Sequence, residues 1–122
     1  MSILAVFIGG GLGSLARYGL SVRFPYEVGT IPVGTLSANV LSSLILGLLM
    51  AYTLKSDPST VFKLLLMVGF CGGFSTFSTF SKEAFDMLQA GHTSLAFGYV
   101  LSSCLLGILC IFLGWKVGSS LF

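Results

Sequence analysis

Charged side chains are scarce in this sequence: it has six Lys or Arg residues, four Asp or Glu residues and one histidine among 122 residues. More than half of the residues are hydrophobic, and so short a chain cannot bury that much apolar surface in one water-soluble core. The three cysteines are an odd number without CxxC spacing, which argues against a zinc site or a disulfide framework. No nucleophile, base or metal constellation typical of an enzyme is recognisable. The composition therefore predicts a small integral membrane protein, not an enzyme, and we expect no nucleic-acid partner.

Four apolar stretches are each long enough to cross a bilayer, which takes about 20 residues. They cover about residues 2–20, 33–54, 63–88 and 94–115, and short connections rich in proline, glycine and charge separate them. The first stretch lacks a basic leader and an A-x-A cleavage site, so we expect a retained helix and not a signal peptide. The predicted fold is one all-α domain, residues 1–122, with four transmembrane helices in the cell (inner or plasma) membrane.

Lysine and arginine favour neither orientation of these helices. An even number of spans puts both termini and the 54–63 loop on one face, with Lys55, Lys63 and Lys116, and leaves the opposite face with three cations as well: Arg17, Arg23 and Lys82. Either an exposed cation has more influence on orientation than a buried one and sets a single orientation, or the chain inserts both ways and pairs with its inverted copy.

A homodimer is expected on separate grounds. Four short helices cannot enclose a polar route and also shield it from lipid, so the polar residues need a partner surface. Gly9 and Gly13 have the GxxxG spacing that lets helix backbones approach closely. That spacing serves equally well between two copies or within one chain.

The third stretch carries the most unusual pattern, because phenylalanine, serine and threonine repeat every three residues from 74 to 81, after three glycines. Glycine weakens a helix, and hydrocarbon tolerates an open backbone only against protein or a wet cavity. We therefore predict a break between Gly72 and Ser75, whose free carbonyls could bind a cation. The alternative is a mild kink with hydroxyls bonded back to the helix. On a continuous helix the phenylalanines of the repeat would form one stripe.

Polar residues also share a face in the second and fourth stretches. Asn39 needs a partner at membrane depth, either another helix or a solute. No acidic residue lies deep in any predicted span, so the groups available to a solute are hydroxyls, the amide and aromatic ring edges, which present mostly positive ends. Arg17 could attract anions at the mouth of such a route, and this chemistry favours anion conduction. The two polar faces are formed by Thr35, Asn39, Ser42 and Ser43, and by Tyr99, Ser102 and Ser103.

Three blocks of the sequence, at residues 10–18, 34–39 and 69–80, resemble the signature blocks of the Fluc (CrcB) fluoride channels. The resemblance covers nearly the whole chain. It implies an antiparallel, dual-topology homodimer in the membrane lipid that exports toxic fluoride by passive conduction, with two pores and a structural sodium ion (Na+) at the dimer centre. By motif position, Asn39 would donate to fluoride, and the backbone carbonyls of Gly72 and Ser75 would bind sodium. The other residues implied for the fluoride pathway are Arg17, Phe77, Ser78, Thr79, Phe80, Tyr99 and Ser103.

Two other functions are compatible with a chain of this size. A four-helix small multidrug exporter can also have dual topology, but it needs a membrane carboxylate to exchange protons for a cationic drug, and the first span has none. A non-transporting membrane assembly subunit would use its polar faces only to bind partner helices, and it would conduct no ion.

Overall fold

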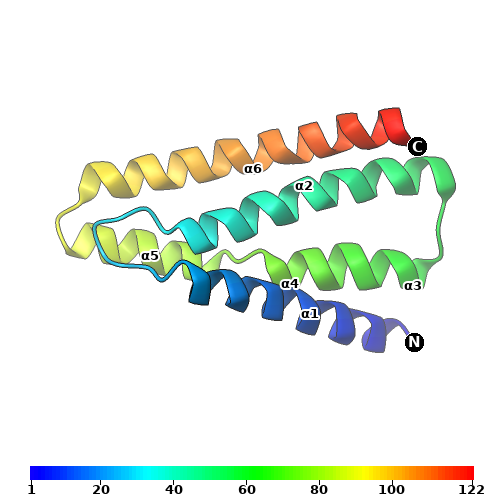
Figure 1. The fold of residues 1–122 in the computed structure, drawn as a ribbon, viewed down its shortest axis with the longest axis horizontal. Helices are drawn as coiled ribbons and strands as arrows, with labels where there is room; N and C mark the ends of the chain where they lie inside the picture. The colour runs from blue at the N-terminus through cyan, green and yellow to red at the C-terminus, as the bar shows by residue number, and fades with distance from the viewer.

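The computed structural model describes all 122 residues, and every regular element in it is a helix (Figure 1). The first, second and fourth membrane-length segments are single helices: α1 (Ser2–Arg23), α2 (Val33–Ser56) and α6 (Thr93–Leu121). The third segment is divided into α3 (Thr60–Lys63), the π-helix η1 (Leu64–Cys71), α4 (Gly72–Phe74) and α5 (Ser78–Gln89). All four segments are long and apolar enough to cross a membrane. The predicted all-α fold with four spans is confirmed.

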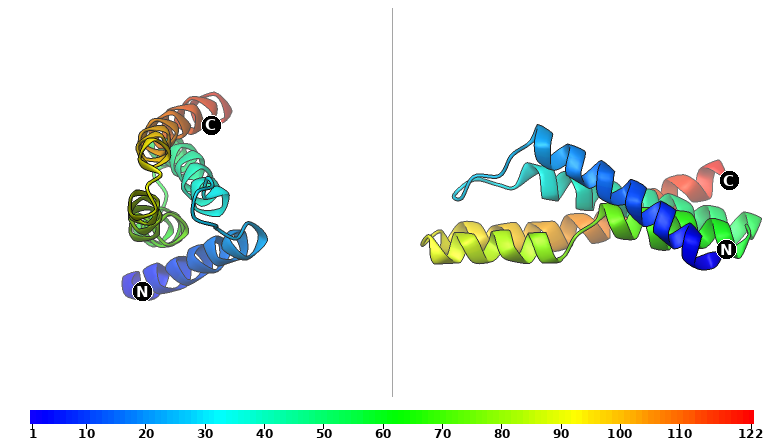
Figure 2. Two further views of the ribbon diagram at one scale, coloured as in Figure 1. Left: turned by 90° about the vertical axis from the view of Figure 1, so that its left-hand side faces the viewer. Right: turned by 90° about the horizontal axis from the view of Figure 1, so that it is seen from below.

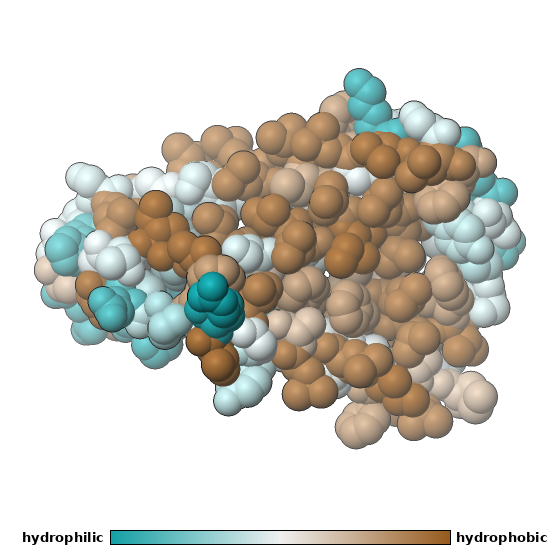
Figure 3. Space-filling view, viewed as in Figure 1, coloured by the Kyte–Doolittle hydropathy of each residue, from teal (hydrophilic) through white to brown (hydrophobic).

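The four segments run up and down, so that both termini and the α2–α3 turn lie at one end of the bundle (Figure 1). The 24–32 loop and the α5–α6 turn lie at the other end. Hydrophobic residues cover most of the visible face between these ends, and hydrophilic residues gather towards the ends (Figure 3). This distribution is that of a multi-pass membrane protein, whose middle faces lipid and whose ends face water.

Helix α1 crosses the third segment obliquely, with its backbone directly against it (Figure 2). A Cβ atom added to Gly9 would collide with the Leu65 carbonyl, and one added to Gly13 would collide with the Phe70 carbonyl. Gly73 is equally close to the backbone of α1. The GxxxG spacing is therefore used within the chain, where small residues let two helices approach closely.

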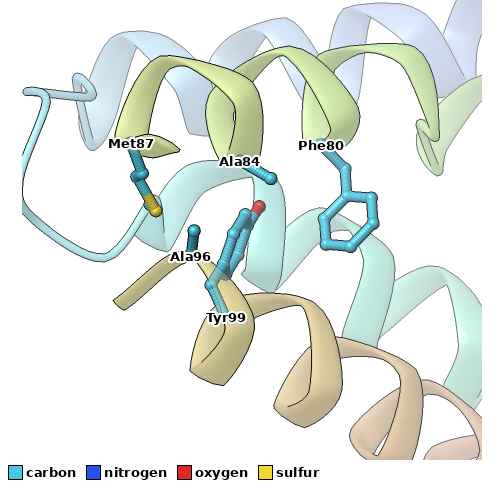
Figure 4. Packing of buried hydrophobic residues seen from close by; sticks show 5 residues of the cluster. All are labelled: Phe80, Ala84, Met87, Ala96 and Tyr99. Atoms are coloured by element: carbon cyan, nitrogen blue, oxygen red, sulfur yellow. The ribbon is translucent and has the colours of Figure 1, made fainter. Parts of the chain in front are cut away.

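Helices α5 and α6 hold a small apolar cluster near the 24–32 loop. Phe80, Ala84 and Met87 extend from α5 towards Ala96 and Tyr99 of α6 (Figure 4). The rings of Phe80 and Tyr99 are in contact, with their centroids 5.1 Å apart. This packing fixes α5 to α6, although α5 is separated from the rest of its own span by a break.

The break lies at Ser75–Phe77, between α4 and α5. Ser75 is extended, with φ −75° and ψ 158°, whereas Gly72 still has helical dihedral angles. The expected break is present, but it falls slightly later than Gly72–Ser75 and inside the phenylalanine repeat. The expectation of one phenylalanine stripe is therefore wrong for the single chain: Phe80 is buried, whereas Phe77 is 79% exposed.

Candidate functional site

Asn39 of α2 holds the break open by binding the backbone of Thr76 twice. The Thr76 N–H donates to Asn39 Oδ1 at 2.8 Å, and Asn39 Nδ2 donates to the Thr76 carbonyl at 3.2 Å. These bonds replace the helical bonds that Thr76 would otherwise make. A carboxamide has two N–H hydrogens, so Asn39 keeps one for another acceptor. Of the two expected partners, the structure shows the helix, and it leaves one donor for a solute.

Two backbone carbonyls at the break, those of Gly72 and Ser75, accept no hydrogen bond. In each case the N–H that would reach the carbonyl in a continuous helix is bound to another group. The Thr76 N–H that would reach the Gly72 carbonyl is bound to Asn39. The Thr79 N–H that would reach the Ser75 carbonyl donates instead to Thr76 Oγ1, at 3.2 Å. No other donor reaches these two oxygens. Free carbonyl oxygens are ligands for hard cations, so Gly72 and Ser75 fit the sodium expected there.

Other polar side chains of α2 also bond to the third segment. Ser42 Oγ donates to the Cys71 carbonyl at 3.2 Å, and Thr35 Oγ1 donates to Glu83 Oε1 at 2.6 Å. Ser43, by contrast, has no hydrogen-bond partner in the chain and faces a cavity. The polar face of α2 therefore serves mainly to hold the broken helix in place.

Glu83 is a functional candidate that sequence analysis missed, because its carboxyl group is buried inside the bundle although it lies beyond the uncharged part of the third span. Its side chain is buried in α5, and its second oxygen accepts the Tyr99 hydroxyl at 2.8 Å. Glu83 follows Lys82 at the end of the apolar run, so it looked like a residue of the membrane surface. Its position was readable from spacing, because Glu83 lies three residues after Phe80 and four before Met87, on the buried face of α5.

A cavity of about 250 Å³ lies on one side of the break, and we call it the Asn39 cavity. Ser103 contributes a buried hydroxyl oxygen that has no hydrogen-bond partner. Phe80 forms part of the wall, and the exposed Phe77 ring stands next to it, with centroids 5.9 Å apart. The cavity is lined by Asn39, Ser43, Ser75, Thr76, Phe77, Phe80, Ser103 and Cys104.

A second cavity, of about 310 Å³, lies on the other side of the break, and we call it the Arg17 cavity. Arg17 Nε donates to the Gly73 carbonyl at 3.1 Å, which ties the guanidinium to α4. No carboxylate pairs with Arg17, because the two salt bridges of the chain use other residues. A guanidinium has five N–H donors, so most of them remain available. The lining residues are Ser14, Arg17, Tyr18, Ser21, Gly34, Thr35, Thr76 and Thr79.

The structure divides the residues predicted for the pathway between these cavities. Asn39, Phe77, Phe80 and Ser103 meet in the Asn39 cavity, and Arg17 and Thr79 lie in the Arg17 cavity. Tyr99 lines neither cavity, because its hydroxyl binds Glu83. Ser78 is exposed and also lines neither cavity. The predicted site is therefore two donor-rich spaces separated by the break.

The chain is similar to known proteins over most of its length. The model of the family described as "CrcB-like protein, Camphor Resistance (CrcB)" matches residues 4–115. A Phocaeicola vulgatus protein named "Fluoride-specific ion channel FluC" is 40% identical over 115 residues, which are 93% of this chain and 94% of the relative. Proteins of the same name from Francisella tularensis subsp. tularensis and Escherichia fergusonii are 38% and 45% identical, covering 94% and 88% of this chain and 92% and 82% of theirs. These matches, which cover most of the sequence, show that the chain belongs to the CrcB family.

Proposed function

We propose that this chain forms a fluoride-selective channel that lets toxic fluoride leave the cytoplasm by passive conduction. The observation that carries the proposal is the pair of donor-lined cavities that meet at the break in the third span. The names of the relatives supply the identity of the ion. An unpaired Arg17 attracts anions to one cavity, and neutral donors in the other can release them again.

The residues of the Asn39 cavity have chemistry suited to a small, strongly hydrated anion. Asn39 offers its remaining N–H, Ser103 and Ser43 offer hydroxyls without partners in the chain, and Phe77 and Phe80 offer ring edges. The edge of an aromatic ring carries the positive part of its quadrupole, so it attracts an anion without holding it as tightly as a cation would. In the Arg17 cavity, Thr79 adds a hydroxyl.

The channel is proposed to be an antiparallel homodimer of dual topology with a structural sodium ion at its centre. The Asn39 cavity is open on the single chain, and the exposed Phe77 ring at its edge is available to a second copy. The free carbonyls of Gly72 and Ser75 support the sodium site, because two copies would together supply the oxygen ligands that a hard cation takes. These carbonyls would hold the ion, and the ion would supply positive charge between the two copies.

The experiment that tests the function is anion release from liposomes that contain the purified protein. Fluoride should leave quickly and chloride hardly at all. Equal release of both anions would contradict selectivity, and release of neither would support an assembly subunit without transport. Dual topology has its own test, because cysteines placed in the α2–α3 turn should be labelled from both sides of the membrane; labelling from one side would exclude it.

The aromatic role is tested with Phe80→Leu, which keeps most of the apolar volume but removes the ring edge. Fluoride release should fall while the protein keeps its oligomeric state. Phe62→Leu is the matched control, since Phe62 contacts Tyr52 far from both cavities. If Phe80→Leu releases fluoride as fast as Phe62→Leu, the rings of the cavity do not contribute to conduction.

A further inference from the structure

Thr76 is the one residue that lines both the Asn39 cavity and the Arg17 cavity. It is the middle residue of the three-residue break, which is not helical. Thr76 is therefore the point at which the two cavities come together.

The backbone and the hydroxyl oxygen of Thr76 are fixed by three hydrogen bonds. Asn39 binds its N–H and its carbonyl, and Thr76 Oγ1 accepts the N–H of Thr79. The oxygen of a hydroxyl can accept one bond and still donate its own hydrogen. No acceptor in the chain receives that hydrogen. Thr76 therefore presents a free O–H donor at the boundary, and its position is set before any ion arrives.

The remaining N–H of Asn39 is close to this donor, because the two residues are paired through Thr76's backbone. A donor held in place stabilises a partly dehydrated anion without the cost of being ordered at that moment. An anion that leaves one cavity for the other exchanges part of its hydration shell for donors of the protein. This is the point at which a fixed donor has the largest effect on the rate of passage.

We propose that Thr76 is the transfer residue of the channel: its hydroxyl hydrogen binds the anion as the ion passes between the Arg17 cavity and the Asn39 cavity. Asn39 is then a positioning residue for Thr76 in addition to its own donor role. The proposal rests on the function proposed above and adds to it the residue at which the two cavities connect.

A purely structural role for Thr76 is the competing explanation, because its oxygen also caps the first turn of α5 through Thr79. Loss of a cap destabilises the protein and lowers the number of working channels. Loss of a transfer donor slows every channel. Liposomes that contain on average less than one channel separate the two effects, since the fraction of vesicles that empty counts working channels and the time constant measures the rate of one channel.

The variants for this experiment are Thr76→Val, which has the shape of threonine without its hydroxyl, and Thr76→Ser, which restores the hydroxyl. Thr53→Val is the matched control, because the Thr53 hydroxyl bonds only to the Met50 carbonyl of its own helix. Thr76→Val should slow fluoride release per channel by roughly tenfold, the effect of losing one hydrogen bond to a charged group, with an unchanged fraction of emptied vesicles. Thr76→Ser and Thr53→Val should keep the rate of the parent protein.

An unchanged time constant in Thr76→Val would overturn the proposal, and a smaller fraction of emptied vesicles with the original time constant would assign Thr76 to capping alone. If Thr76→Val does not fold, Thr76→Cys decides, since a thiol is a weaker donor: a slower channel supports the proposal and the parent rate overturns it. Failure of the proposed function is recognised separately, because the unmodified protein would then release no fluoride.

Discussion

Replacing Gly13 by alanine should destabilise the protein, because it would force α1 away from the third span. The added Cβ would lie 2.7 Å from the backbone nitrogen of Phe74 and still closer to the Phe70 carbonyl, whereas ordinary contacts begin at 3.4 Å. Both obstacles are backbone atoms that cannot rotate aside. Overpacking of this kind costs about 1–3 kcal/mol.

The same helix offers matched controls in Gly11 and Gly19, where an added Cβ would meet nothing within 4 Å. At these positions alanine should leave stability unchanged or raise it by up to about 1 kcal/mol, since alanine is the better helix former. The free energy of unfolding can be measured by denaturant titration in mixed micelles. Gly13→Ala should fall clearly below both controls.

If Gly13→Ala were as stable as the parent protein, the packing described for α1 would be refuted. A loss at Gly11 as large as the loss at Gly13 would also change the interpretation, because it would place Gly11 against a second copy of the chain. The comparison therefore tests directly whether the GxxxG spacing serves the monomer or the dimer.

Two further predictions concern the break and the α2–α3 turn. Asn39→Leu should lower the free energy of unfolding by about 1–3 kcal/mol, because both backbone groups of Thr76 lose their partner. Asn39→Asp keeps an acceptor for the Thr76 N–H and should lose less. If the unfolding curve of Asn39→Leu coincides with that of the parent protein, the two Asn39–Thr76 hydrogen bonds do not stabilise the fold. Lys63 donates to Asp57 at 2.8 Å, and this hydrogen bond, more than the charge attraction, lowers the pKa of the exposed Asp57 carboxyl. The pair therefore stabilises the fold above the ordinary pKa of aspartate, and this contribution is lost as the pH falls through the lowered pKa. Asp57→Asn should be less stable than the parent at neutral pH and equal to it in strong acid, as measured by the thermal midpoint; a difference that is the same at both pH values would contradict this assignment.

The spans were predictable because membrane helices depend on length and hydropathy, which are local properties of the sequence. The break was predictable for the same reason, since glycines cluster before it and hydroxyl residues lie in it and after it. Its position was not, because it depends on Asn39, which is 37 residues away and takes the Thr76 N–H from the helix. A long-range hydrogen bond of this kind leaves no local signal.

The sequence also did not predict that the candidate site is divided into two cavities. Ser78 and Thr79 are neighbours in a polar repeat, yet only Thr79 lines a cavity, because α5 starts anew at Ser78 after the break. Spacing places Glu83 on the buried face of α5, but the sequence does not show that Thr35 and Tyr99 bind its carboxyl group from two other helices. In each case the missing information was the packing of separate segments and not the preference of any one residue.

The π-helix η1 determines how the residues that follow it in the third segment are rotated about the helix axis. A π-helix bonds each N–H five residues back instead of four, so it advances through a smaller angle per residue than an α-helix. If its eight residues relaxed to α-helical winding, the chain after Cys71 would rotate about its axis. Gly73 would then turn away from α1, and Thr76 would turn away from Asn39. The rotational position of the pathway residues is therefore set earlier in the span, by residues that line neither cavity.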